Sequence, residues 1–126
     1  METKVISTPK APAAIGPYVQ GIQAGDFIFF SGQIGIDPAV GKLVEGCVKC
    51  QAKQVFKNIA ALLEEVGATT ANVVKTTVFL VDIADFAAVN ELYAEFFGDN
   101  KPARSCVAVH QLPLNARVEI EITVAK

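Results

Sequence analysis

The chain has 126 residues, a formal net charge of −2 and three cysteines. This length is typical of one domain, so residues 1–126 are expected to share a single core. The small negative charge has no basic block beside it, which argues against a nucleic-acid-binding protein. No apolar run is long enough to cross a bilayer, and the N-terminus lacks the apolar segment of a signal peptide. We therefore expect a soluble, cytoplasmic protein that binds neither nucleic acid nor membrane.

Apolar residues make up 52% of the chain, although glycine is not counted in that figure. Soluble domains usually contain about 45–50%, and a small domain has little interior in which to hide a surplus. We therefore hypothesise that part of the surface is buried against copies of the same chain. Three cysteines cannot all pair within one chain, which fits a reducing compartment.

The first 24 residues predict two strands. Residues 4–7 form a short strand candidate, and the prolines of residues 8–12 then hold the chain in extended or turn conformations. Gly16 and Pro17 bring the hydroxyl of Tyr18 to the start of a second strand that runs to about residue 24.

A two-residue hairpin turn is predicted at Gly25 and Asp26. The run that follows, residues 27–32, is apolar on both faces until Ser31. It is therefore expected to be a central strand or one covered on both sides. Gly32 at its end allows another group to approach the backbone closely.

The middle of the chain predicts two amphipathic helices, which follow a loop around residues 37–41 and flank a β-branched strand at residues 73–81. The first helix covers about residues 46–66 and its apolar stripe is Val48, Ala52, Val55, Phe56, Ile59, Leu62, Leu63 and Val66. The second is capped by Asp82 or Asp85, and its stripe is Phe86, Val89, Asn90, Tyr93, Phe96 and Phe97.

Asn90 is a polar residue within that second stripe. A buried amide needs hydrogen-bond partners, so two interpretations stay open. The side chain either makes a structural hydrogen bond to a neighbouring strand or loop, or belongs to a functional pocket.

Residues 102–126 predict two strands joined by a loop at residues 110–115. If these strands pair antiparallel with their apolar faces matched, Arg104 lies opposite Glu121, or opposite Glu119 after a slip of two residues. One interpretation is a cross-strand salt bridge on a solvated face. The other is that Arg104 awaits a carboxylate from outside, which leaves Glu119 free for proton transfer.

The order of elements, β-β-β-α-β-α-β-β, predicts an α+β domain in which a mixed six-stranded sheet carries both helices on one face. In this arrangement the helices cover Val107 and Val118. The opposite face, with Arg104, Cys106 and Glu119, meets water or another subunit.

Cys47 and Cys50 have C-x-x-C spacing in the first turn of the first predicted helix. No second pair of ligands accompanies them, and by helical phase Cys50 faces solvent while Cys47 lies at the edge of the apolar stripe. A redox or metal role is therefore not favoured. His110 is the single histidine and cannot form a zinc site alone, so no metal is expected.

Four segments together resemble the reactive intermediate deaminase (RidA/YjgF) family over essentially the whole chain: APAAIGPYVQG, FFSGQIGID, VVKTTVFLVDIADFAAVNELYAEFF, and PARSCVAVHQLP with ARVEIEITVAK. PARSCV with its downstream glutamate is the most specific part. The resemblance implies a chorismate-mutase-like fold and a homotrimer, with sheets packed into a central barrel and three clefts between subunits.

The resemblance also implies an activity, hydrolysis of enamine and imine acids such as 2-aminoacrylate and 2-aminocrotonate to 2-oxo acids and ammonia, without metal or cofactor. Arg104 then grips the substrate carboxylate, the backbone of Cys106 lines the cleft, and Glu119 is associated with the water. The remaining pocket residues are Tyr18, which can bond the substrate, Ser31, Gly32 and Asn90.

Two other functions stay open. One is a non-catalytic module that binds 2-oxo acids in the same cleft. The other is RNA cleavage, which the acidic balance and the lack of a basic stripe make less favoured.

Overall fold

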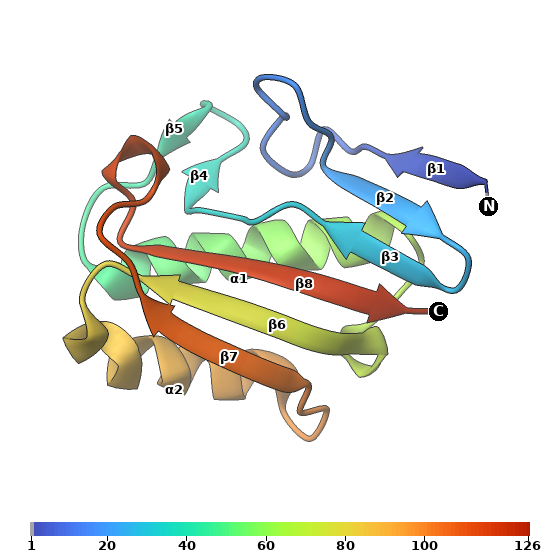
Figure 1. The fold of residues 1–126 in the computed structure, drawn as a ribbon. Helices are drawn as coiled ribbons and strands as arrows, with labels where there is room; N and C mark the ends of the chain where they lie inside the picture. Colours follow the sequence, from blue (N-terminus) through green and yellow to red (C-terminus); the bar gives the residue numbers. More distant parts are fainter. Residues whose placement is uncertain (1) are drawn as a thin grey trace.

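The structure, a computed structural model, describes residues 2–126. Within this range it contains a six-stranded sheet, a two-stranded sheet and two α-helices. The elements are β1 (Thr3–Ile6), β2 (Gly21–Ala24), β3 (Phe27–Phe30), β4 (Ile36–Asp37), β5 (Lys42–Leu43), α1 (Val48–Glu65), β6 (Val73–Leu80), α2 (Phe86–Phe97), β7 (Ala103–Ala108) and β8 (Val118–Ala125) (Figure 1).

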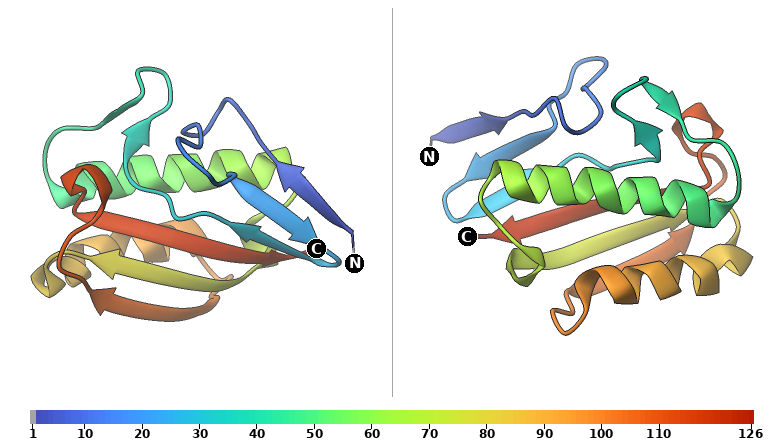
Figure 2. Two further views of the ribbon diagram at one scale, coloured as in Figure 1. Left: turned by 45° about the horizontal axis from the view of Figure 1, so that its top comes forward. Right: turned by 180° about the vertical axis from the view of Figure 1, so that it is seen from behind.

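The six strands follow the order β1-β2-β3-β8-β6-β7. Every neighbouring pair is antiparallel except β6 and β7, which are parallel because α2 connects them. Both helices lie on one face of this sheet (Figure 2). The predicted α+β architecture, a mixed six-stranded sheet with two helices on one face, is therefore confirmed.

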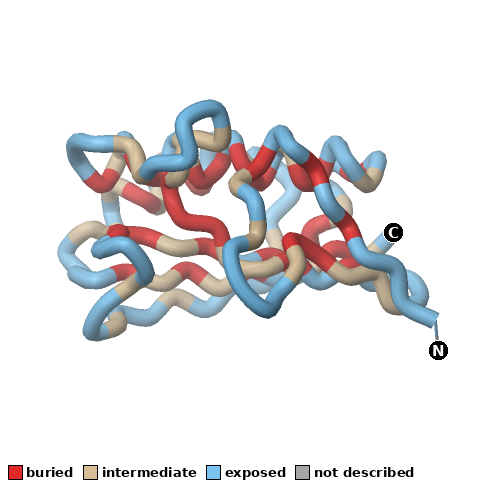
Figure 3. Tube along the Cα trace, turned by 90° about the horizontal axis from the view of Figure 1, so that it is seen from above, coloured by how far each residue is buried: buried red, intermediate tan, exposed pale blue. Residues whose placement is uncertain are grey.

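The core lies between the sheet and the helices, and buried positions alternate with exposed ones along the strands (Figure 3). The predicted stripe of α1 is buried throughout, apart from a half-buried Val66. An aromatic cluster joins the two helices, with the rings of Phe56 and Phe96 stacked at 4.9 Å between centroids. Tyr93 and Phe97 complete the cluster on α2.

Local turn signals were correct. β2 ends at Ala24 and β3 begins at Phe27, and Gly25 between them has a φ of 61° that favours glycine. Asp82 does act as a cap, because its carboxylate accepts the N–H of Ala84 at 2.9 Å. It caps the single 3-10 turn Ile83–Asp85, which leads directly into α2.

The predicted pairing of the last two strands is wrong. β6 lies between β7 and β8, so that Val78 of β6 is opposite Cys106 and Phe79 is opposite Glu119 (Figure 1). The alternation of apolar and polar residues predicts which residues share a face but not which strand is the neighbour. Because β7 and β8 are consecutive in the sequence, a hairpin between them was predicted. The chain instead passes over the end of β6 after β7, and β8 pairs with the other side of β6.

The predicted face of β7 is also wrong. Arg104 and Cys106 are in register with the buried Thr76 and Val78, so they lie on the face that carries the helices. Val107 lies on the opposite face and is 42% exposed. β7 is an edge strand with weak contrast between its two faces, which is why the pattern misassigned it. Glu119 does lie on the face away from the helices, as predicted.

The expected loop around residues 37–41 contains a small hairpin, β4 paired with β5. Asn58 attaches it to α1, because its side-chain amide donates to the backbone carbonyls of Ile34 at 3.3 Å and Ile36 at 2.9 Å. Asn58 is only 1% exposed, so these hydrogen bonds replace those that its side-chain amide would otherwise make with water.

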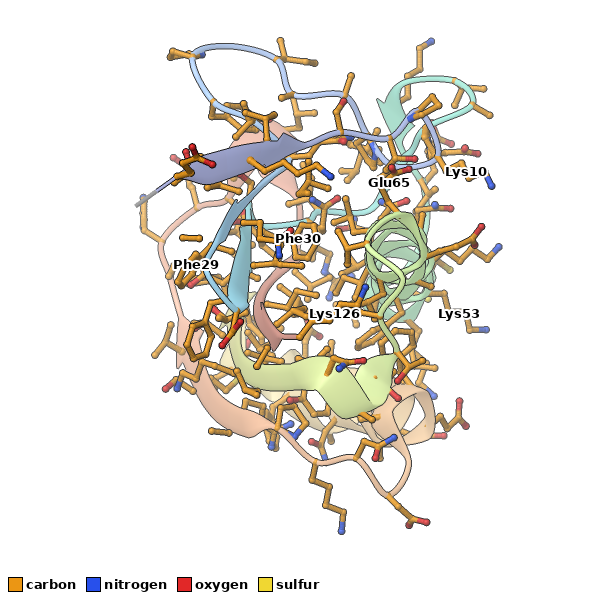
Figure 4. The ribbon with its side chains drawn as sticks, turned by 90° about the vertical axis from the view of Figure 1, so that its right-hand side faces the viewer. Lys10, Phe29, Phe30, Lys53, Glu65 and Lys126 are labelled. Carbon is orange, nitrogen blue, oxygen red and sulfur yellow. The ribbon has the colours of Figure 1, made fainter. Side chains whose placement is uncertain are left out.

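β3 is central in the sheet, but one of its faces is open in the single chain. Figure 4 shows Phe30 on the side of β3 that faces α1 and Phe29 on the other side. Phe30 is 5% exposed and Phe29 is 50% exposed.

In residues 2–126, neither helix combines the length and the apolar character needed to span a bilayer.

Replacing Asn58 by alanine should lower the free energy of unfolding by about 1–3 kcal/mol, because the buried carbonyls of Ile34 and Ile36 lose their donor. The measurement is urea unfolding. The control is Lys57→Ala, an exposed neighbour on the same helix, which should change the value by less than about 0.5 kcal/mol. Equal effects of the two substitutions would contradict the assigned role.

Candidate functional site

Arg104 projects from β7 towards α2, and three side chains of the α2 region hold it. One terminal nitrogen (Nη1) donates to the side-chain oxygen of Asn90 at 2.7 Å. The guanidinium carbon lies 4.6 Å from the centre of the Tyr93 ring and 5.3 Å from that of Phe86. A cation over aromatic faces is attracted by their electrons, so the group is oriented before any ligand arrives.

The Tyr93 ring is itself fixed. Its hydroxyl lies 2.7 Å from that of Thr76, a buried residue of β6. Burial raises the pKa of Tyr93, while the hydrogen bond with Thr76 and the charge of Arg104 oppose that rise. The ring is therefore a neutral platform beneath the guanidinium at physiological pH.

Arg104 has no carboxylate partner within residues 2–126, where the ion pairs are Lys10–Glu64, Lys49–Glu91 and Arg117–Asp85. The guanidinium is exposed and lines a hollow of about 430 Å³ together with Asn90, Lys101 and Pro102. We call this the arginine hollow. The cross-strand salt bridge is thus rejected, and the cation is free to pair with an anion from outside the chain.

Cys106 follows Arg104 on the same face and packs against the core. Burial raises the pKa of its thiol, and the neighbouring charge of Arg104 opposes this only in part. A protonated thiol is a poor nucleophile, so the position favours a structural role for the side chain.

The second group of predicted residues surrounds another hollow of about 440 Å³, which we call the glutamate hollow. Its polar lining includes Tyr18, Ser31 and Glu119. The Ser31 hydroxyl donates to the carbonyl of Val19 at 2.7 Å, which fixes its oxygen, and Tyr18 is 52% exposed. The apolar part of the lining includes Ile15, Ile34 and Leu114.

Gly32 lies directly against Glu119. The segment after β3 runs beside β8, because Gln33 and Ile120 exchange backbone hydrogen bonds at 2.8 and 3.0 Å. A β-carbon at Gly32 would overlap the Glu119 carboxylate. The sequence predicted that another group approaches the backbone closely at Gly32, and that group is the Glu119 side chain.

Burial raises the pKa of Glu119 above its ordinary value, and the charge of the nearby Glu121 acts in the same direction. A carboxyl group with a raised pKa is better matched to proton transfer near neutral pH than an ordinary surface glutamate.

The structure sorts the seven predicted residues into two groups. Asn90, Arg104 and Cys106 lie on the helix side at the edge strand β7, whereas Tyr18, Ser31, Gly32 and Glu119 adjoin the glutamate hollow. β6 and the thickness of the sheet separate Arg104 from Glu119, so one chain does not bring the two groups together.

Sequence reasoning missed Tyr93 and Phe86 as partners of Arg104. Both were assigned to the core because they fit the helical stripe, and their spacing of three or four residues from Asn90 was the available signal. It also missed Leu114, whose backbone has a φ of 57° at the rim of the glutamate hollow, and for which the local sequence offers no signal.

Comparisons with known proteins identify the family of this chain. The model of the family described as endoribonuclease L-PSP matches residues 8–126. The chain belongs to this family. Among its relatives, the RutC family protein of Pyrococcus abyssi is 53% identical, over 96% of this chain and 95% of that protein.

Another relative, the human 2-iminobutanoate/2-iminopropanoate deaminase, is 52% identical over 94% of this chain and 86% of that protein. The crystal structure of RidA from an Antarctic Psychrobacter is similar, with a TM-score of 0.93 and 43% identity over 98% of this chain and 99% of that one. The resemblance to reactive intermediate deaminases is confirmed.

The raised pKa of Glu119 predicts a pH-dependent stability. Because folding favours the neutral carboxyl, the stability it contributes is present below the unfolded-state pKa, about 4.3, and is lost as pH rises through the higher folded-state pKa. Glu119→Gln should therefore be more stable than wild type at neutral pH, and this gain should disappear at acidic pH.

The measurement is denaturant unfolding at a series of pH values and fixed protein concentration. Glu95→Gln, an exposed position on α2, is the matched control and should show no such trend. A Glu119→Gln protein that is less stable than wild type at neutral pH would contradict the assigned environment.

Gly32→Ala should displace the Glu119 carboxylate while costing little stability, because the displaced atoms are the end of a flexible side chain. A crystal structure of the variant checks this directly. An unmoved carboxylate in a folded variant would show that the close approach is not as described.

Proposed function

We propose that this chain hydrolyses enamine and imine acids, such as 2-aminoacrylate and 2-aminocrotonate, to 2-oxo acids and ammonia. Relatives named as 2-iminobutanoate/2-iminopropanoate deaminase and as Reactive Intermediate Deaminase A support the general activity. The observation that carries the specific proposal is the Arg104 guanidinium, which is oriented by Asn90 and two aromatic rings and is unpaired within residues 2–126.

A planar guanidinium can bind a carboxylate through two parallel hydrogen bonds, which fixes both the position and the orientation of a small acid. Asn90 accepts a hydrogen bond from one terminal nitrogen of Arg104, so the N–H groups of the other guanidinium nitrogens are left to donate to a ligand. Orientation of this kind can supply much of the rate enhancement when the reaction itself is easy.

Besides a bound carboxylate, the reaction needs only a water molecule and a group that transfers protons. The enamine tautomerises to an imine, water adds to the imine carbon, and the resulting carbinolamine loses ammonia to leave the 2-oxo acid. Glu119 would accept a proton from the water and return it to the departing nitrogen, a role that suits its raised pKa. From the same hollow, Tyr18 would offer its hydroxyl group to the substrate, and Ser31, whose proton is donated to Val19, would offer its oxygen as an acceptor.

In this proposal the active site forms between subunits of a homotrimer, because Arg104 and Glu119 lie on opposite faces of one sheet. The open face of the sheet supports such an assembly. In a monomer this face would leave three large apolar side chains in water, namely Phe27, Phe29 and Val107. Packing that face against other copies would bury these side chains and bring one chain's glutamate hollow to a neighbour's edge strand.

Arg104→Ala should lower kcat/KM for 2-aminoacrylate generated in situ by about 30-fold or more, since losing one partner of a desolvated charge pair costs about 2–5 kcal/mol. Arg104→Lys should recover part of the loss, because lysine restores the positive charge but not the planar guanidinium that can donate two parallel hydrogen bonds. Lys53→Ala, which removes an exposed positive charge on α1, should keep wild-type ammonia release. A wild-type rate for Arg104→Ala would reject the proposal.

Mixing two impaired variants tests whether the site is shared. Arg104→Ala and Glu119→Gln proteins, denatured together and refolded as mixed trimers, should regain roughly a quarter of wild-type activity, because about one cleft in four receives both intact residues. Each variant refolded alone is the control and should keep only its own lowered activity. Light scattering should give three times the 13.4 kDa of one chain. A site contained within one chain would show no recovery.

The family description makes RNA cleavage the second candidate. The formal charge of −2 does not favour a polyanionic substrate. If RNA were the substrate, highly purified protein would degrade it and Arg104→Ala would change that rate. Saturable binding of 2-oxobutanoate without turnover of any imine would instead indicate a binding module.

A further inference from the structure

Cys47 and Cys50 face each other at the start of α1. Their sulfur atoms are 3.1 Å apart, and both residues are exposed. Cys47 is the N-cap residue of the helix, with an extended backbone, and Cys50 lies in the first turn. The helical phase assumed from the sequence placed Cys47 inside the helix, whereas its extended conformation turns its thiol towards Cys50.

This arrangement is close to that of a disulfide. Residues three apart at a helix end are neighbours, and a disulfide needs a sulfur separation of about 2.05 Å. The two sulfurs are therefore only about 1 Å further apart than in a disulfide. Gly46 makes room for it, because a β-carbon there would lie 3.1 Å from the Cys50 sulfur, and its φ of 113° also favours glycine.

Cys47 and Cys106 differ in the direction of their pKa shifts. The Cys50 thiol lowers the pKa of the Cys47 thiol, and the backbone N–H groups of Cys50 and Lys49 act in the same direction. No carboxylate occupies the first turn of α1, all of which the structure describes, so a thiolate meets the partial positive charge of the helix end. For Cys106, burial raises the pKa of the thiol.

We propose that Cys47 and Cys50 form a redox-active dithiol that exchanges with small or protein disulfides. The Cys47 thiolate attacks one sulfur of an external disulfide and forms a mixed disulfide, and the first external thiolate leaves. Cys50 then attacks the Cys47 sulfur and releases the second. The two cysteines are oxidised to one internal disulfide, the external disulfide is reduced to two thiols, and the two cysteine protons pass to them.

A metal site does not account for the pair. Among residues 2–126, no group of three or more histidine, cysteine or acidic side chains converges, and two thiolates fall short of the four ligands of a structural zinc. Neither cysteine lines the arginine hollow or the glutamate hollow. The dithiol is therefore independent of the proposed deaminase activity. The experiment that tests it measures the oxidation state of the thiols and not the release of ammonia.

The experiment uses the full-length protein, first reduced and then equilibrated in buffers with increasing ratios of oxidised to reduced glutathione. Free thiols are trapped with iodoacetamide and identified by intact mass and peptide mapping. We expect the loss of two hydrogens, an internal disulfide between Cys47 and Cys50 at every protein concentration, and a free Cys106. In the reduced protein, Cys47 should react with iodoacetamide at least about tenfold faster than Cys106 at pH 7.

Single serine variants test the order of attack. Cys50→Ser should accumulate glutathione on Cys47, because the resolving thiol is missing. Cys47→Ser should carry much less glutathione on Cys50, and neither variant should form an internal disulfide. The proposal is overturned if oxidised glutathione leaves all three thiols free, if the disulfide joins two chains or involves Cys106, or if the two variants take up glutathione equally.

Discussion

The parallel pairing of β6 with β7 governs the placement of the candidate site. α2 connects these strands, β7 is an edge strand, and Arg104 and Cys106 of β7 lie on the face that carries the helices. Asn90 and Tyr93 of α2 then orient the guanidinium. The same connection forces the chain to cross past β6 before β8, and this separates Arg104 from Glu119. A catalytic pairing of the two residues depends on a second chain.

Burial and local charge give chemically similar groups different properties. Glu119 and Cys106 both have raised pKa values because they are partly withdrawn from water, whereas Cys47, exposed at a helix end beside a second thiol, has a lowered one. Arg104 keeps its charge unpaired within the described chain, yet aromatic rings cover one side of it. The chain thus holds a carboxyl group with a raised pKa, a guanidinium without a carboxylate partner and a thiol with a lowered pKa in three separate environments.

Much of the fold could be predicted because it depends on interactions between residues that are close in the sequence. The turn at Gly25, the stripe of α1 and the alternation of β8 each follow from backbone freedom or from the period of a helix or strand. The failures share one cause. The partner of β7 and the face of Arg104 depend on how distant strands pack, and alternation along an edge strand such as β7 carries little contrast between its faces.

By itself, the amino-acid sequence determined the types and order of the two helices and of the strands of the six-stranded sheet, the amphipathic faces of the helices and the residues capable of the chemistry, because these depend on neighbours within a few positions. Only the tertiary structure decided that Arg104 binds Asn90 rather than a glutamate, that Gly32 makes room for Glu119, and that the thiols of Cys47 and Cys50 touch. Each of these contacts depends on strand order or on the exact start of a helix, which are set by packing of the whole chain and not by any local pattern.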